Sequence, residues 1–288
     1  MSPCIKKSLH QLYNVPCFIF WENKMTIYFL GGGNMAAAIV AGLCQAERTA
    51  EIHVANRGAE KRAALAAKYD VTVSEKLPTL TKNDVLILAV KPQDMQAACE
   101  NVASNGALVI SLAAGLSIAT LSHYLSGTQR IIRAMPNTPA QIGLGVTGLF
   151  AASAINKADK HIAQAIFATS GSTVWLNDEA QMHAITAVSG TGSAYVFYLM
   201  NALQQAALDL GFDAEQARTL SLQTFKGAVA LAEHTGEELR VLQDKVTSQG
   251  GTTFAALTHF NEQQVAQHIG AGVQAACARS QELAKMFE

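Results

Sequence analysis

The sequence is poor in charged residues, and the two signs of charge nearly cancel. Only 15% of the 288 residues are charged, with 21 Lys and Arg against 22 Asp and Glu. It also has no basic block of the kind that binds nucleic acid or an acidic membrane surface. We therefore expect no nucleic-acid partner and no membrane partner. Because half of the residues are hydrophobic, we expect a compact globular protein.

Cysteine and histidine do not occur at the spacings that make metal sites. The sequence contains no C-x-x-C pair and no H-x-x-x-H pair, which are common arrangements of zinc ligands. We therefore predict no metal site. The five cysteines are scattered and odd in number, which favours free thiols in a reducing compartment. This predicts a cytoplasmic protein.

The first residues carry no clear signal for export or for a folded segment. Lys6 and Lys7 precede the apolar run Val15–Trp21, but the run is short and no small-residue cleavage site follows it. We predict that residues 1–24 are a tail outside the fold.

A glycine turn follows the apolar segment Thr26–Leu30. Its spacing is G-x-G-x-x-A, in which the first glycine permits a tight turn and the second lets a pyrophosphate approach the backbone. The small residue Ala36 would let the next helix pack on the strand. The residues predicted to hold the pyrophosphate are Gly31, Gly33, Asn34 and Met35. Such turns also join strands to helices in proteins that bind no ligand there. Whether this turn binds a dinucleotide therefore depends on the fold that the neighbouring segments predict.

Apolar strand-like segments then alternate with helix-like segments as far as residue 176. The predicted strands cover 26–30, 51–56, 84–90, 107–112, 130–134, 144–151 and 172–176. This alternation indicates an α/β fold with a Rossmann-like, mostly parallel and doubly wound sheet. We predict a dinucleotide-binding domain at 25–176 and an all-α domain at 177–288.

Helices alone are predicted after residue 177. The predicted helices cover 178–187, 193–210, 213–234, 237–247, 252–260 and 262–287. Within the second of them, Ala194–Met200 is apolar almost all round, and such a helix must be buried on every side. Because a small helical domain has few such places, we predict a homodimer formed through this domain.

Polar residues follow the predicted strands at the sheet edge where open α/β folds bind ligands. Asn56 and Arg57 stand where a second strand reads the cofactor ribose. An arginine there suits a 2′-phosphate, which favours NADPH over NADH; a surface arginine without a ligand is the alternative. Further residues predicted to contact the cofactor are Ala89, Val90, Lys91, Pro92 and Ala113. A solvated Lys91 is again the alternative.

A second glycine-rich turn joins two predicted helices at Asp244–Thr253. Gly250 and Gly251 can bring backbone N–H groups around a small anion, and Thr252 and Thr253 begin the next helix, whose positive end favours a carboxylate. An ordinary helix connection with a threonine cap is the alternative.

From Met25 to its end, the chain resembles the family of pyrroline-5-carboxylate reductases. The most specific similarity is Val246–Thr253, which resembles the family signature. The other similar segments, in the same order as in the family, are Ile27–Met35, Leu88–Gln93, Ala113–Gly115, Met135–Pro139 and Ala187–Tyr195.

The resemblance implies reduction of the cyclic imine L-1-pyrroline-5-carboxylate to L-proline with a hydride from NAD(P)H. It implies that Thr253 is the catalytic residue, with a hydrogen-bonding and orienting role, and that Ser189 supports the site. The substrate-binding residues that it implies are Ser248, Gly250, Gly251, Thr252, Thr253 and Thr186. In the family this site forms between two subunits, so the predicted dimer would complete it; a larger ring of dimers is left open.

The chain departs from the family at three places. Gln249 and Ser193 stand where the family usually has proline, which questions the rigidity of two loops. Glu75 and Lys76 stand where the family tends to have an asparagine that touches the adenosine ribose.

Two other functions have to be weighed. A 3-hydroxyacid dehydrogenase shares the layout but carries a lysine on the first long helix after the cofactor domain, and residues 184–210 contain none. A dinucleotide-binding protein without catalysis would not need the segment Val246–Thr253. Both alternatives are therefore disfavoured.

Overall fold

The computed structural model describes residues 25–46 and 50–287. The prediction for residues 1–24 lies outside this part of the chain. Two compact units are present: the first extends to Gly190 and includes the end of the chain from Ala278 onward, and the second is Thr191–Cys277.

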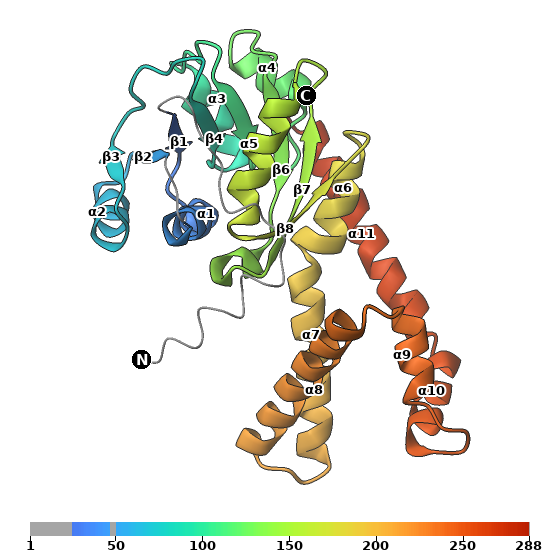
Figure 1. Cartoon of the computed structure of the whole chain (residues 1–288). Coiled ribbons are helices and arrows are strands. Elements are labelled where there is room, and N and C mark those ends of the chain that lie inside the picture. Colours follow the sequence, from blue (N-terminus) through green and yellow to red (C-terminus); the bar gives the residue numbers. More distant parts are fainter. Residues whose placement is uncertain (1–24, 47–49, 288) are drawn as a thin grey trace. The chain divides into compact units, whose positions relative to one another are not determined.

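Eight strands form one sheet within the described residues (Figure 1). They are β1 (Thr26–Leu30), β2 (Glu51–Ala55), β3 (Thr72–Ser74), β4 (Val85–Leu88), β5 (Leu108–Ser111), β6 (Ile131–Met135), β7 (Gly145–Ala151) and β8 (Gly171–Trp175). Their order is β3-β2-β1-β4-β5-β6-β7-β8. All neighbours run parallel except β6 and β7. The predicted Rossmann-like, mostly parallel sheet is confirmed.

Strand β1 is the third strand of the sheet and lies between β2 and β4. Ile27 stands opposite Ile52 of β2 on one side and opposite Val85 of β4 on the other. The chain order reverses between β1 and β4, and open α/β sheets bind their ligands at the carboxyl ends of the strands beside such a point. The glycine turn after β1 lies at this position.

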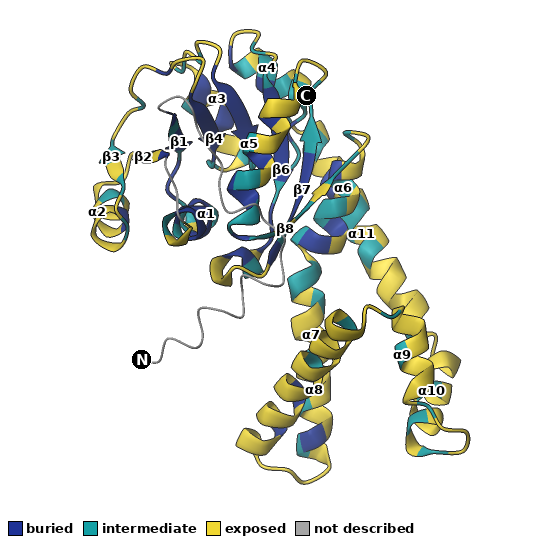
Figure 2. Cartoon of the chain, in the orientation of Figure 1, coloured by how far each residue is buried: buried dark blue, intermediate teal, exposed yellow. Residues whose placement is uncertain are grey.

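The core covers both faces of the sheet, as the dark blue central strands in Figure 2 show. All four residues of β4 are buried. Val85 and Ile87 join a cluster with Phe29 on one face, whereas Leu86 and Leu88 join a second cluster on the other face. A strand buried on both faces of a sheet needs an unbroken run of apolar residues. This is why the sequence predicts a strand here although apolar and polar residues do not alternate.

Short helices connect the strands of the first unit. They are α1 (Asn34–Gln45), α2 (Ala59–Lys68), η2 (Pro92–Asp94), α3 (Met95–Cys99), α4 (Ile118–Tyr124), η3 (Thr138–Ile142), α5 (Lys157–Ala168), α6 (Gln181–Ile185) and the π-helical turn η4 (Thr186–Gly190). The hydroxyl of Ser117 accepts from the Thr120 N–H at 3.0 Å and caps α4. Strand β3 was not predicted, because three residues are too few to show a period.

Helices make up the whole second unit. They are α7 (Gly192–Asp209), α8 (Ala214–Thr235), α9 (Leu239–Lys245) and α10 (Thr252–Glu262), together with α11 (Val265–Lys285), which continues past the unit's last residue. Local signals define α8 well: Asp213 and Gln216 form a capping box, and Gly236 ends the helix with φ of 64°. No helix in the described part of the chain is long and apolar enough to cross a membrane.

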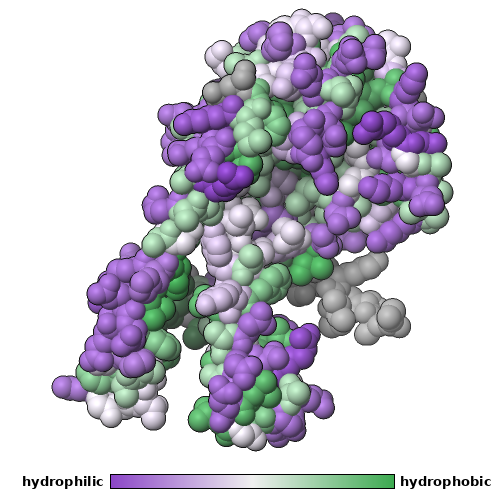
Figure 3. All heavy atoms as spheres, turned by 180° about the vertical axis from the view of Figure 1, so that it is seen from behind, coloured by the Kyte–Doolittle hydropathy of each residue, from purple (hydrophilic) through white to green (hydrophobic). Residues whose placement is uncertain are grey.

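The second unit has almost no core of its own. Its buried residues are Ala207, Ala217 and Ser221, so α7 and α8 meet through small side chains, and Figure 2 shows most of both helices as exposed. Large apolar side chains lie outside instead: Phe197 is 60% exposed and Tyr198 is 73% exposed. Figure 3 shows apolar residues reaching the surface over these helices. Such a surface is typical of an interface.

Candidate functional site

The turn after β1 requires glycine at its first position. Gly31 has φ of 104°, and a Cβ added there would lie 2.8 Å from the carbonyl oxygen of Ala89. Any other residue would be strained and would collide with backbone. The turn is therefore tightly packed against the residues that follow β4, which brings Gly31 next to Ala89.

Helix α1 begins directly after this turn with free backbone donors. Its N-cap, Gly33, has ordinary extended backbone with φ of −75°, and nothing lies within 4 Å of a Cβ added there. The first bond back into the helix is from the Ala37 N–H to the Gly33 carbonyl at 2.9 Å. The N–H groups of Asn34, Met35 and Ala36 therefore point out of the helix start, where a phosphate is stabilised.

Asn56 braces the glycine turn. Its side-chain oxygen accepts from the Gly32 N–H at 3.1 Å, and its amide nitrogen donates to the Gly58 carbonyl at 3.1 Å. The guanidinium of Arg62 donates to the carbonyls of Asn56 and Arg57 at 2.6 and 2.9 Å. The backbone here is thus held from both sides, while the side chain of Arg57 is exposed.

The other predicted cofactor residues lie at the same edge of the sheet. Ala89 follows β4, and its N–H donates to the Leu30 carbonyl at 2.8 Å. Val90, Lys91 and Pro92 come next and lead into η2, with Lys91 exposed as its N-cap. Ala113 follows β5 and is buried. The carboxyl ends of β1, β2, β4 and β5 therefore bring all of these predicted residues to one side of the first unit.

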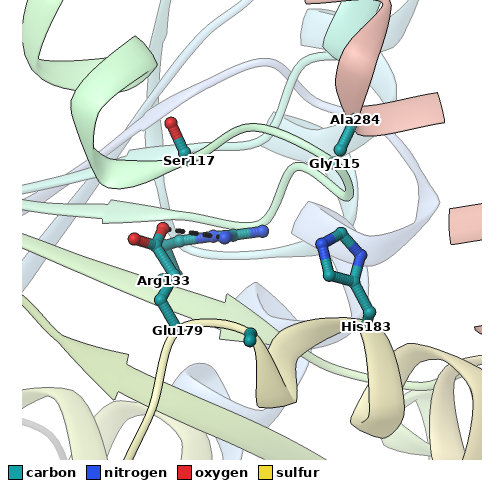
Figure 4. A pocket seen from close by; sticks show the side chains of 7 residues that line it. Gly115, Ser117, Arg133, Glu179, His183 and Ala284 are labelled. Carbon is teal, nitrogen blue, oxygen red and sulfur yellow. Dashed lines mark hydrogen bonds and ion pairs between the residues drawn. The ribbon is translucent and has the colours of Figure 1, made fainter. Parts of the chain in front are cut away.

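A small pocket of about 230 Å³ lies in the first unit, lined by residues from β6, α6, the segment before α4 and the end of α11 (Figure 4). At its base Arg133, with a side chain only 5% exposed, donates to Glu179 at 2.8 Å. Glu179 also accepts from the Ile118 N–H at 2.7 Å. Figure 4 shows the Arg133 guanidinium between the Glu179 carboxylate and the ring of His183.

Burial and charge shape the proton affinities in this pocket. Burial lowers the pKa of Arg133, and its hydrogen bond and ion pair with Glu179 oppose that shift. The pKa of His183 is lowered by burial first and by the positive Arg133 second, with Glu179 again opposing. The imidazole is thus held neutral, and its Nδ1 lies 3.0 Å from the Ser280 hydroxyl. This arrangement ties α6 and α11 to the sheet.

Thr186 and Ser189 lie in the π-helical turn η4, directly after α6. The Thr186 hydroxyl donates to the Met182 carbonyl at 2.7 Å, and Ser189 is buried. Single π turns are rare, and many of them occur at functional sites.

The second glycine turn lies in the second unit, between α9 and α10. Gly250 has φ of 73°, and a Cβ on Gly251 would lie 2.5 Å from the Ser248 hydroxyl oxygen, so both positions suit glycine. The first bond back into α10 is from the Ala255 N–H to the Gly251 carbonyl at 3.1 Å. The N–H groups of Thr252 and Thr253 are therefore at the free start of a helix, with Thr252 exposed and Thr253 half-buried.

The sequence alone did not identify several residues whose side chains hold segments of the first unit together. They are Arg62, Arg133, Asn137, Glu179 and His183. Arg133 gave a usable signal, since it is a lone charge inside the apolar strand 131–135. The hydrogen-bond partners of Arg133, Asn137 and His183 in this region lie 46, 52 and 97 residues further along the chain, so no spacing rule could have paired them. Arg62 differs, because the carbonyls that it bonds lie only five and six residues before it. Among the described residues no group of three His, Cys, Asp or Glu side chains could hold a metal ion.

Two family models match the chain. One, described as NADP oxidoreductase, coenzyme F420-dependent, matches residues 26–115, and the other, described as pyrroline-5-carboxylate reductase dimerisation, matches residues 179–283. The fold and the glycine turn therefore define an oxidoreductase that uses a nicotinamide cofactor, with a helical part for self-association.

Individual relatives narrow this class. The pyrroline-5-carboxylate reductase of Haemophilus influenzae is 41% identical over 266 residues, which cover 91% of this chain and 98% of the relative. A solved structure of such a reductase from Coxiella burnetii has a TM-score of 0.84 and 36% identity, covering 91% of this chain and 99% of that chain. The Plasmodium falciparum pyrroline carboxylate reductase, solved with NADP bound, has a TM-score of 0.77 and 25% identity, covering 90% and 98%. The chain belongs to the pyrroline-5-carboxylate reductase family.

Proposed function

We propose that this protein reduces L-1-pyrroline-5-carboxylate to L-proline. The proposal rests mainly on one observation: two helices of this chain, α1 and α10, begin with free backbone N–H groups that suit an anion. The start of α1 suits the pyrophosphate of a dinucleotide, and the start of α10 suits the carboxylate of a small substrate.

The chemistry asks the protein mainly for positioning. When bound, the nicotinamide cofactor supplies the hydride. The backbone N–H groups of Thr252 and Thr253 hold the substrate carboxylate, and the hydroxyl of Thr253 orients the ring nitrogen. Gly251 shapes the turn beside the substrate, since its own N–H donates to the Ser248 carbonyl at 3.0 Å. Thr186 and Ser189 support the substrate from η4, while Ser248 and Gly250 shape the turn. A threonine is too weak an acid to be the proton source, so the imine reacts in its protonated form.

NADPH is the cofactor that we propose as preferred over NADH. Asn56 is committed to the turn by its two hydrogen bonds, which leaves the exposed Arg57 as the group suited to a 2′-phosphate. No carboxylate that would bind a ribose diol occupies either position. The ratio of kcat/KM with the two cofactors measures the preference. The residues of the proposed cofactor site are Gly31, Gly33, Asn34, Met35, Asn56, Arg57, Ala89, Val90, Lys91, Pro92 and Ala113.

The working molecule is proposed to be a homodimer through the second unit, with a ring of dimers as the larger form. The exposed apolar side chains of α7 support this, because a unit with so small a core needs a partner to cover it. We also propose that it works in the cytoplasm, since the five cysteines are scattered and odd in number, which favours a reducing compartment.

The test is oxidation of NADPH in the presence of L-1-pyrroline-5-carboxylate, with a 3-hydroxyacid and NADP⁺ as the rival reaction. We expect turnover with the imine alone. Thr253→Ala should lower kcat/KM for the imine roughly 10- to 100-fold, because an oriented hydrogen bond is lost, and should leave the NADPH dissociation constant unchanged within about twofold.

The matched control is Thr258→Ala, which removes an exposed threonine from the same helix. It should behave as the wild type does. Turnover with the hydroxyacid alone would reject the proposed reaction, and a Thr253→Ala enzyme with wild-type kinetics would remove Thr253 from the site.

A further inference from the structure

Asn137 lies at the meeting point of three segments of the first unit. It follows β6 in the turn Met135–Pro139 and is only 8% exposed. Its side-chain oxygen accepts from the Val146 N–H at 2.9 Å, at the start of β7. Its amide nitrogen donates to the hydroxyl of Ser189 at 3.3 Å and to the carbonyl of Ser189 at 3.5 Å. Both ends of one buried amide are therefore used, and they join β6, β7 and η4.

The turn that Asn137 holds is a weak element by itself. The π-helix is a rare element that is seldom longer than one turn, so we expect it to depend on support from its surroundings. In η4 the side chains of Ala187 and Ser189 are buried, whereas Val188 is 62% exposed. A Cβ added to Gly190 would lie 2.7 Å from the Cε of Met135. The turn is thus pressed against the end of β6, where Asn137 provides its side-chain anchor.

The same contact surface continues into α6. A Cβ added to Gly148 of β7 would lie 2.7 Å from the Cγ1 of Ile185, the last residue of α6. Figure 1 shows α6 next to β7. The helix and the turn after it are therefore packed on the strand, and a loss of the Asn137 anchor would free the end of this segment while the helix stays docked.

We propose that Asn137 is a positioning residue for the reaction: it fixes η4, and so holds Thr186 and Ser189 where they support the imine substrate. This inference rests on the proposed function, because it needs those two side chains to serve the substrate. Asn137 itself acts through Ser189. The amide meets both needs at this position, since its oxygen accepts from one backbone group while its nitrogen donates to the oxygens of Ser189.

The first arm of the test does not depend on activity. Hydrogen exchange of the purified full chain is measured for Asn137→Ala and for Asn156→Ala, which removes the asparagine cap of α5. We expect exchange in residues 186–190 to accelerate at least about tenfold in Asn137→Ala and not in Asn156→Ala. Residues 157–168 should show the reverse. Unchanged exchange in η4 would overturn the proposal.

The second arm is kinetic. Asn137→Ala should lower kcat/KM for L-1-pyrroline-5-carboxylate at least about tenfold while the dissociation constant of NADPH stays within about twofold. Asn156→Ala, with a comparable loss of thermal stability, should keep both values. The double variant Asn137→Ala with Ser189→Ala should lose less kcat/KM than the two single losses multiplied together, since both substitutions remove the same contact.

The outcomes separate the two claims. Faster exchange in η4 with unchanged kinetics would show that the turn is anchored by Asn137 but does not serve the substrate, which overturns the proposal. If the wild-type enzyme does not turn over the imine, the proposed function is rejected. The hydrogen-exchange experiment would then show only whether Asn137 anchors η4. If Asn137→Ala does not fold, Ser189→Ala takes its place in both arms.

Discussion

Several single side chains in this protein form ion pairs or hydrogen bonds that join segments far apart in the sequence. Arg133 is a buried cation on a strand, and its charge is compensated by Glu179 from the segment after β8. A buried guanidinium without a partner would cost several kcal/mol, about 3–5 kcal/mol when a fully buried pair is broken. Glu179 is partly exposed, so the cost here is smaller, but the pair still fixes the position of α6 on the sheet.

His183 gives this region a dependence on pH. Its pKa is lowered from the usual 6.5 in the folded protein, chiefly by burial. Below pH 6.5 the unfolded chain therefore binds a proton that the folded chain resists. This contribution to stability is complete above about pH 6.5 and is lost as the pH falls toward the lowered pKa. We expect the urea midpoint of the wild type to fall between pH 7.5 and pH 5.5.

His183→Gln should make that fall smaller, because the neutral amide takes up no proton. His53, whose pKa is also lowered by burial, leaves a remainder of the same sign. Ser280→Ala is the matched control, since it removes the partner of His183 and keeps the imidazole. If His183→Gln loses as much stability on acidification as the wild type, the histidine is not the source.

The turn between β1 and α1 shows how one short element combines a folding need with a binding need. Gly31 is required by its positive φ and by the Ala89 carbonyl that a Cβ would meet. Gly33 is different, because its backbone is ordinary and the space beside it is open. The fold therefore does not require the second glycine, and its presence fits the predicted approach of a pyrophosphate to this backbone.

Gly33→Ala should fold with a melting temperature close to that of the wild type and bind NADPH at least about tenfold more weakly, because its methyl group occupies the place of the pyrophosphate. Fluorescence titration with NADPH measures the affinity. Gly31→Ala is the contrast: it should lower the melting temperature as well. A Gly33→Ala protein with wild-type affinity would mean that the dinucleotide does not approach this backbone.

The second unit explains why the molecule is expected to work as an assembly. Its helices are well capped, yet its only buried side chains, in a unit described in full, are two alanines and a serine. Hydrophobic burial is the main source of stability in folded proteins, so helices of this kind are stable only when another surface covers them. The dimerisation model that matches residues 179–283 agrees with this reasoning.

Phe197→Glu tests the role of the exposed face of α7. A charge in place of a side chain that is 60% exposed in the single chain should cost little in a monomer and several kcal/mol in a buried interface, about 2–4 kcal/mol. Sedimentation velocity over a dilution series should show dissociation at higher concentration than for the wild type. Lys157→Ala, which changes the net charge equally at an exposed site of α5, should not. Equal sedimentation of all three would exclude this face from the interface.

Much of this protein was predictable because its signals are local. The apolar run of β4 and the glycine turn after β1 each depend on neighbouring residues, and the structure confirms both elements. The predicted strand 84–90 was too long: β4 covers Val85–Leu88, and Pro92 starts a separate 3₁₀ turn after it. The roles assigned to the site residues, and the domain limits 25–176 and 177–288, remain predictions.

The sequence by itself determined the fold class, the family and the two helix starts that suit anions, since each of these is written in consecutive residues. Only the tertiary structure decided which side chains hold these parts in place. Arg133 and Glu179 are 46 residues apart and Asn137 and Ser189 are 52 apart, and such pairs exist only once the strands have taken their order in the sheet. Asn56 is a further example: the sequence predicts that it contacts the cofactor, and the folded chain shows in addition that its side chain accepts from the Gly32 N–H, 24 residues earlier.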